Sequence, residues 1–117
     1  MTGESAGANI AHNMGIRLGE QKIDGIEVSG IILVHPYFRG EEPLPSEPVL
    51  PESKSSFNTR FWKAASPTST GCDDPLMNPA KDPKLSGMGC SRILVYVTEK
   101  DELRYRGWYY KEVLSKS

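Results

Sequence analysis

The sequence has no long apolar run and no excess of charge of either sign. No stretch reaches the roughly 18 apolar residues that a membrane helix needs, so we expect no membrane span. The 14 Lys and Arg residues nearly balance the 15 Asp and Glu residues, for a net charge of −1. The basic residues are scattered, so a nucleic-acid partner is not expected.

Targeting signals and glycosylation sites are also lacking. The first residues have no basic segment followed by an apolar core, so we expect no signal peptide. No Asn-x-Ser/Thr sequon occurs. These absences favour a cytoplasmic protein.

Cysteine is scarce, and its positions suggest no metal or redox site. Cys72 and Cys90 do not have the CxxC spacing of a redox motif, so we expect free thiols in a reducing compartment. Asp73 and Asp74 follow Cys72 and precede Pro75, without a nearby histidine. This spacing fits no common metal site, and we interpret it as a loop turn. No metal and no cofactor are expected.

Two apolar runs predict strands. Residues 30–38 and 92–98 are continuous and rich in β-branched side chains, which is typical of strands buried on both faces of a parallel sheet. No strand is predicted before residue 5. The more than 50 residues between the runs contain four prolines within residues 41–56, together with a possible short helix at 57–65. Such a long irregular insertion is usually functional or mobile, and a lid or cap is one way to explain it.

Two segments predict helices. Residues 6–18 place Ile10, Ala11, Met14 and Leu18 at helical spacing, and Gly19 is the expected stop. Residues 104–115 predict a second helix, with four side chains expected to pack against the sheet: Trp108, Tyr109, Val113 and Leu114. The pattern of strands and helices indicates the α/β class.

The segment Gly3-Glu4-Ser5-Ala6-Gly7 matches G-x-S-x-G and leads directly into the first predicted helix. A sharp turn from strand to helix exposes the oxygen of a nucleophilic serine, and the glycines permit close approach of the backbone. The N–H of Ala6, at the positive end of the helix, is placed to bind an oxyanion. The five-residue pattern alone fits a glycine-rich helix cap equally well.

Four segments resemble, in the same order, blocks of the plant carboxylesterases, a hormone-sensitive-lipase-like branch of the α/β-hydrolases. They are Gly3-Glu4-Ser5-Ala6-Gly7-Ala8-Asn9-Ile10-Ala11-His12-Asn13, His35-Pro36-Tyr37-Phe38, Gly71-Cys72-Asp73-Asp74-Pro75-Leu76-Met77-Asn78-Pro79 and Glu99-Lys100-Asp101-Glu102-Leu103-Arg104. The resemblance covers essentially the whole chain. Glu4 and Tyr105 depart from the family, which usually has aspartate at both positions, but neither change touches the chemistry directly.

The resemblance implies a partial α/β-hydrolase domain over residues 1–117. We expect a parallel sheet core with helices and a loop-rich, cap-like insertion, without the N-terminal strands and the C-terminal histidine segment of the family. Ser5 is then the nucleophile, and Asp101 is the triad acid that orients an imidazole. Asp101 follows the second strand, where α/β sheets place functional loops. Without the resemblance, an aspartate in such a charged segment is more often a solvated loop charge than a catalytic acid, and Glu99 and Glu102 compete for the role.

The chain has two histidines, and both precede Asp101, whereas the triad histidine of an α/β-hydrolase follows the acid. His12 lies in the first predicted helix and suits packing or the surface. His35, at a strand end, suits a buried hydrogen-bonded residue or, alternatively, a substitute base. The HGGG-type oxyanion loop is absent too. We therefore expect the chain alone to be nearly inactive.

Aromatic and proline-rich segments have open interpretations. Phe57, Phe61 and Trp62 suit either the lining of an acyl pocket or packing of the cap. The cluster at residues 108–110 suits core packing. The proline-rich residues 41–51 suit a solvated loop better than a peptide ligand.

The function implied by the resemblance is hydrolysis of small or medium carboxylic esters. Ser5 attacks the carbonyl, the Ala6 N–H holds the oxyanion, Asp101 orients the histidine, and Gly3, Gly7 and Asn9 support the turn. Two alternatives remain open: a gibberellin-receptor-like binding protein and an isoflavanone-dehydratase-like lyase, because fold does not decide function. The partner is a small-molecule ester, and the oligomeric state is left open.

Overall fold

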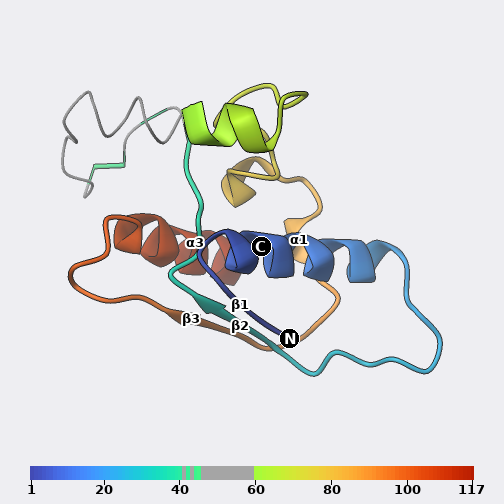
Figure 1. The fold of residues 1–117 in the computed structure, drawn as a ribbon. Helices are drawn as coiled ribbons and strands as arrows, with labels where there is room; N and C mark the ends of the chain where they lie inside the picture. The colour runs from blue at the N-terminus through green and yellow to red at the C-terminus, as the bar shows by residue number, and fades with distance from the viewer. Residues whose placement is uncertain (41, 43, 46–59) are drawn as a thin grey trace.

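The structure, a computed structural model, describes residues 1–40, 42, 44–45 and 60–117. It contains a three-stranded parallel sheet in the order β1 (Thr2–Glu4), β2 (Ile31–Val34) and β3 (Ile93–Tyr96). Helices α1 (Ala6–Glu20) and α3 (Arg104–Lys116) lie side by side on one face of this sheet (Figure 1). The predicted α/β class is confirmed.

The first strand is a correction to the prediction that no strand precedes residue 5. Residues Thr2–Glu4 pair in parallel with Ile32–Val34, and Ile32 donates its N–H to the carbonyl of Met1 at 2.9 Å. The sequence does not reveal this strand because its three residues form no apolar run. It is defined by pairing with β2 rather than by its own side chains.

One face of the sheet is buried and the other is open. Ile31 and Leu33 are 1% and 0% exposed, whereas Ile32 and Leu94 are 44% and 60% exposed. The expectation that both predicted strands are buried on both faces is therefore wrong for the described residues. The physical reason is that α1 and α3 cover the same face, the one that carries Ile31 and Leu33.

Helix α1 is confirmed as an element, but the face that it buries is not the predicted one. Ile10 and Met14 are 64% and 39% exposed. The buried residues follow a different helical stripe: Ala8, Asn9, Ala11, His12, Gly15 and Ile16. This stripe contains small residues, so the helix lies close to the sheet; a Cβ on Gly15 would meet Ile31 Cδ1 at 2.7 Å.

Gly19 is not the helix stop, because α1 continues to Glu20 and is capped by the extended residue Gln21. Its lack of a side chain serves packing instead. A Cβ at Gly19 would lie 1.6 Å from the carbonyl oxygen of Gly87. Gly87 ends the short 3₁₀ helix η2 (Leu85–Gly87), so Gly19 lets this segment contact the end of α1.

Replacing Gly19 with alanine is expected to lower the free energy of unfolding by about 2 kcal/mol, because the new methyl group overpacks a contact between two backbone segments and one of them has to shift. Gly87→Ala is the matched control, since a Cβ there meets no atom of the described residues within 4 Å. Urea midpoints of the two variants measure the difference. Equal midpoints would show that η2 does not pack against α1 as described.

The main core lies between the sheet and the two helices. Phe38 stacks on Tyr110, with ring centroids 4.9 Å apart, and both side chains are at most 2% exposed. Val113 and Leu114 pack against this core as predicted, but Trp108 is 58% exposed. The predicted packing role of Trp108 is therefore wrong, and Tyr110 occupies the core position of the aromatic cluster.

The insertion between β2 and β3 is described only in part. Residues 60–65 are helical, whereas residues 57–59 of the predicted helix and most of the proline-rich segment lie outside the described residues. The rest consists of turns with the short helices η1 (Pro79–Lys81) and η2. A second apolar cluster of Tyr37, Trp62, Cys72 and Met77 connects this insertion to the end of β2. Within the described ranges, no helix has the length and apolar character required to cross a bilayer.

Candidate active site

Ser5 stands at the turn between β1 and α1 with a strained backbone. Its φ is 53° and its ψ is −117°, in a region that residues with a side chain rarely adopt. The residue is exposed. Its side chain makes no capping hydrogen bond to α1 within the described residues, although serine is a favourable cap. The hydroxyl is therefore presented to solvent rather than used to hold the helix.

Several backbone hydrogen bonds hold the turn at Ser5 in place. The Ser5 N–H donates to the Val34 carbonyl at 2.8 Å. The Ser5 carbonyl accepts from Ala8, Asn9 and Tyr37 at 3.0, 3.2 and 3.2 Å. Such bonds are what a strained conformation needs in order to persist.

The N–H of Ala6, the first residue of α1, has no acceptor in the described part of the chain. The first N–H groups of a helix have no partner inside the helix, and the helix dipole adds positive potential there. An anion close to Ser5 would therefore be favoured. This is the property that an oxyanion site needs.

The two glycines of the motif are not equivalent. A Cβ at Gly3 would lie 2.2 Å from the carbonyl oxygen of Gly7 and 2.8 Å from the backbone nitrogen of Ala8. Among the described residues, a Cβ at Gly7 would meet nothing within 4 Å. In this part of the chain the close approach of the backbone therefore involves Gly3, and the predicted role of Gly7 stays a prediction.

Asp101 lies at the same edge of the sheet as Ser5. Because Glu4, Val34 and Tyr96 share one register, the carboxyl ends of the three strands meet there. Ser5 directly follows β1, and the loop that carries Asp101 follows β3. The arrangement brings the predicted nucleophile and acid to one edge, while their roles stay predictions.

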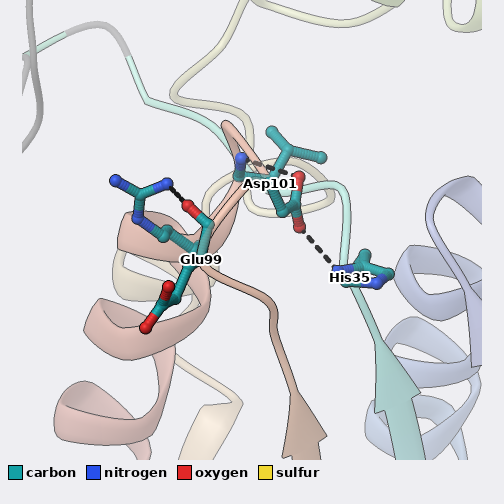
Figure 2. Close-up of polar contacts among 5 residues, drawn as sticks. His35, Glu99 and Asp101 are labelled. Carbon is teal, nitrogen blue, oxygen red and sulfur yellow. Dashed lines mark hydrogen bonds and ion pairs between the residues drawn. The ribbon is translucent and has the colours of Figure 1, made fainter.

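The residue between them in the sheet order is His35, directly after β2. Its Nδ1 lies 2.8 Å from Oδ2 of Asp101 (Figure 2). Sequence reasoning considered His35 only as a buried residue or a substitute base, and it did not predict this pairing. The available signal was its position: a histidine before proline at a strand end next to the serine turn.

The other candidate acids and base lie in different surroundings. Glu99 and Glu102 are exposed, and the carboxylate of Glu99 points away from His35 (Figure 2). His12 is 0% exposed and contacts Tyr110 of α3, with 3.0 Å between Nδ1 and the hydroxyl oxygen. Burial lowers the pKa of His12 to about 4, although the charge of Asp82 opposes the shift. A packing role for His12 is what this geometry supports.

Asn9 connects the first turn of α1 to two other segments. Its Nδ2 donates to the carbonyls of Tyr37 at 3.0 Å and Leu76 at 2.8 Å. The insertion is thereby held next to the serine turn. The proposed support of the turn by Asn9 acts through these bonds, which the sequence alone did not indicate.

The aromatic residues of the insertion divide into two environments. Trp62 is 8% exposed and donates its indole N–H to Ser69 Oγ at 2.9 Å, so it packs inside the insertion. Phe61 is 48% exposed and contacts the Tyr37 ring edge-on, with centroids 5.9 Å apart. Phe57 lies outside the described residues. Burial raises the pKa of Tyr37, so this phenol stays neutral beside the site.

The acidic pair after Cys72 is engaged in local turns. Asp74 accepts from the Leu76 N–H at 2.9 Å and from Ser69 Oγ at 3.0 Å. Asp73 accepts from the side-chain amide of Asn78 at 3.0 Å. Across the described ranges, no group of three or more possible ligand residues is arranged to hold a metal ion.

Comparisons with known proteins agree with the geometry. The sequence pattern of a family described as "alpha/beta hydrolase fold" matches residues 1–117. "Probable carboxylesterase 2" of Arabidopsis thaliana is 40% identical over all of this chain and 37% of its own length. "2-hydroxyisoflavanone dehydratase" of Glycyrrhiza echinata is 41% identical over 95% of this chain and 35% of its own length.

Further matches extend the same relationship. "Tuliposide A-converting enzyme 1, chloroplastic" of Tulipa gesneriana is 38% identical over all of this chain and 29% of its own length. The crystal structure of vibralactone cyclase matches 98% of this chain and 36% of its own, with a TM-score of 0.63 and 15% identity, a likeness of fold alone. This chain spans about a third of the length of the curated relatives that it matches. From its fold, its serine turn and these relatives, the chain belongs to the α/β-hydrolase fold family, in the branch of the plant carboxylesterases.

Proposed function

We propose that this chain supplies the nucleophile and the acid of a carboxylic-ester hydrolase, with Ser5 as nucleophile and Asp101 as acid. The observation that carries the proposal is the turn at Ser5: an exposed serine, a strained backbone and an N–H at Ala6 that has no acceptor among the described residues. The carboxylesterases among its relatives support the reaction class.

In this mechanism Ser5 Oγ attacks the ester carbonyl while a base removes its proton. The negative charge of the tetrahedral intermediate develops close to the Ala6 N–H and the positive end of α1. The alcohol then leaves with the proton from the base, and water hydrolyses the acyl-serine by the same steps. Asp101 orients the base and stabilises its cation.

The base is expected to be an imidazole that follows the acid in the sequence. This sequence contains no histidine after Asp101, so the chain alone is expected to be nearly inactive. Imidazole added to the solution can take the place of the base. Added imidazole therefore makes the proposed role of Ser5 measurable as a rate of ester hydrolysis.

The test compares hydrolysis of p-nitrophenyl acetate by the chain and by Ser5→Ala, with and without added imidazole. Without imidazole, we expect equal rates. With imidazole, we expect the parent chain to hydrolyse the ester roughly tenfold faster than Ser5→Ala does. This gain is smaller than the roughly hundredfold or more that a base positioned by the protein provides. Ser29→Ala, an exposed serine elsewhere, is the matched control and should behave like the parent chain.

Mass spectrometry supplies the second readout, because the acetyl group should be found on the peptide that contains Ser5. If imidazole produced no acetyl-Ser5 and Ser5→Ala reacted like the parent chain, the proposed nucleophile would be wrong. A Ser5-dependent rate without imidazole would instead contradict the expected inactivity of the chain.

A lyase is the second candidate function, because one relative at 41% identity is named a 2-hydroxyisoflavanone dehydratase. Formation of an isoflavone from a 2-hydroxyisoflavanone, without acetylation of Ser5, would favour it. The gibberellin-receptor interpretation stays open, because a catalytic histidine after the acid would decide it, and this sequence contains no histidine after Asp101. A cytoplasmic location also stays a prediction, and the tulip relative is named chloroplastic.

A further inference from the structure

The contact between His35 and Asp101 joins two neighbouring segments at the carboxyl edge of the sheet. His35 follows β2 and Asp101 lies in the loop between β3 and α3, and Figure 2 shows the imidazole and the carboxylate pointing toward one another. The two side chains are 26% and 17% exposed. At 2.8 Å the two atoms are at hydrogen-bond distance, and the tautomer of His35 decides whether Nδ1 donates to the carboxylate.

The carboxylate of Asp101 is held at both oxygens. Oδ2 contacts His35 Nδ1, and Oδ1 accepts the N–H of Leu103 at 3.0 Å. The main chain of Asp101 is held as well, because its N–H donates to Thr98 and its carbonyl accepts from Arg104, at 3.1 and 3.2 Å. Without His35, one side of the carboxylate would lose its partner and the side chain could rotate.

His35 is itself fixed in an unfavourable conformation. Its φ is 46°, and it shares a positive φ with Ser5 alone among the described residues other than glycine. Its N–H donates to the Tyr96 carbonyl at 2.8 Å, and its ring meets the Tyr96 ring edge-on at 5.8 Å between centroids. A strained residue held by several contacts is typical of a functional site.

We propose that His35 is a positioning residue for Asp101: its Nδ1–H donates to Oδ2 and sets the direction of the carboxylate. This inference rests on the proposed function, in which Asp101 orients the catalytic base. A carboxylate oxygen can accept more than one hydrogen bond, so Asp101 still accepts from the imidazole of that base. The bond requires that neutral His35 carries its proton on Nδ1.

The first test is nuclear magnetic resonance of the ¹⁵N-labelled chain, which distinguishes the two tautomers of neutral histidine. We expect His35 to be protonated at Nδ1, and to lose this preference in Asp101→Ala. Glu99→Ala, an exposed acid of the same loop, is the matched control and should leave the signal unchanged. If neutral His35 carried its proton on Nε2 in the folded parent chain, the proposal would be overturned, whatever the activity.

The second test uses the imidazole-supported, Ser5-dependent reaction described above. His35→Ala should lower its rate roughly tenfold, because misplacing a catalytic group by about 1 Å costs up to about a hundredfold. His35→Asn should recover part of the rate, since an amide can also donate to Asp101. In the Asp101→Ala background, His35→Ala should have no further effect, because the two residues act through one bond.

The outcomes separate this inference from the proposed function. If Ser5→Ala removes the imidazole-supported rate but His35→Ala does not change it, the positioning role is overturned and the nucleophile stands. If Ser5→Ala has no effect, the proposed function fails, and the tautomer of His35 still decides the contact. Hydrolysis without imidazole that requires both Ser5 and His35 would also overturn the inference, because His35 would then be the base.

Discussion

Gly3→Ala is expected to destabilise the chain by about 3 kcal/mol, at the upper end of what overpacking costs. The new Cβ would lie 2.2 Å from the carbonyl oxygen and 2.5 Å from the carbonyl carbon of Gly7. These are backbone atoms in the first turn of α1, so they cannot rotate away as a side chain could. The helix would have to move off β1, which disturbs the turn at Ser5.

Gly7→Ala is the matched control within the same motif. A Cβ there meets no described residue within 4 Å, and alanine is the better helix former, so we expect equal or slightly higher stability. Urea unfolding followed by circular dichroism compares the two variants with the parent chain. Destabilisation of similar size in both would mean that the described approach of β1 to α1 is incorrect.

The second large effect concerns the pH dependence of stability and originates at His12. Burial lowers its pKa in the folded chain to about 4, from an ordinary value of 6.5. The folded state therefore favours the neutral imidazole, while the unfolded state takes up a proton below pH 6.5. The stability contributed by folding with a neutral His12 is therefore complete above pH 6.5. It falls as the pH decreases toward 4, because the unfolded chain binds a proton that the folded chain does not, and it levels off below that pH.

The size of the effect follows from the shift. The lowering of the His12 pKa from 6.5 to about 4 corresponds to roughly 3 kcal/mol of stability between the two ends of that window. The buried Nε2 of His12 has no hydrogen-bond partner among the described residues, so no hydrogen bond at this atom stabilises the protonated form, and the charge of Asp82 offsets only part of the cost of burial. Tyr110 does not offset this, because burial raises the pKa of its hydroxyl and keeps it neutral.

The measurement compares the free energy of unfolding of the parent chain with that of His12→Gln between pH 7 and 4. Glutamine does not titrate, so the difference between the two curves isolates His12 from the acidic residues that both chains share. We expect the advantage of the parent chain to shrink as the pH falls. A constant difference would show that His12 is not buried as a neutral side chain.

Local features of the sequence were sufficient for the α/β class, for the helices around residues 6–18 and 104–115, and for the candidate Ser5. Each rests on a short pattern: helical spacing, a β-branched run, or glycines flanking a serine. Asp101 needed the additional resemblance to a family, because an acidic residue in a charged loop has no local pattern that distinguishes it.

The buried face of α1 was predicted incorrectly, and the reason is physical. Spacing selects the stripe with the largest apolar side chains, Ile10 and Met14. A helix that approaches a sheet as closely as α1 does must instead bury its smallest residues, together with polar residues whose partners come from elsewhere. Asn9 and His12 are buried because Tyr37, Leu76 and Tyr110 supply those partners. None of these contacts is local in sequence.

By itself, the sequence determined which residue types are available for chemistry: a serine between glycines at a helix start, an aspartate after a strand, and no histidine beyond it. Only the tertiary structure decided which of them meet. The parallel register brings the ends of β1, β2 and β3 to one edge, and the loop after β3 turns back so that Asp101 reaches His35. Such pairing across 66 positions depends on strand register and loop geometry, which no short stretch of sequence encodes.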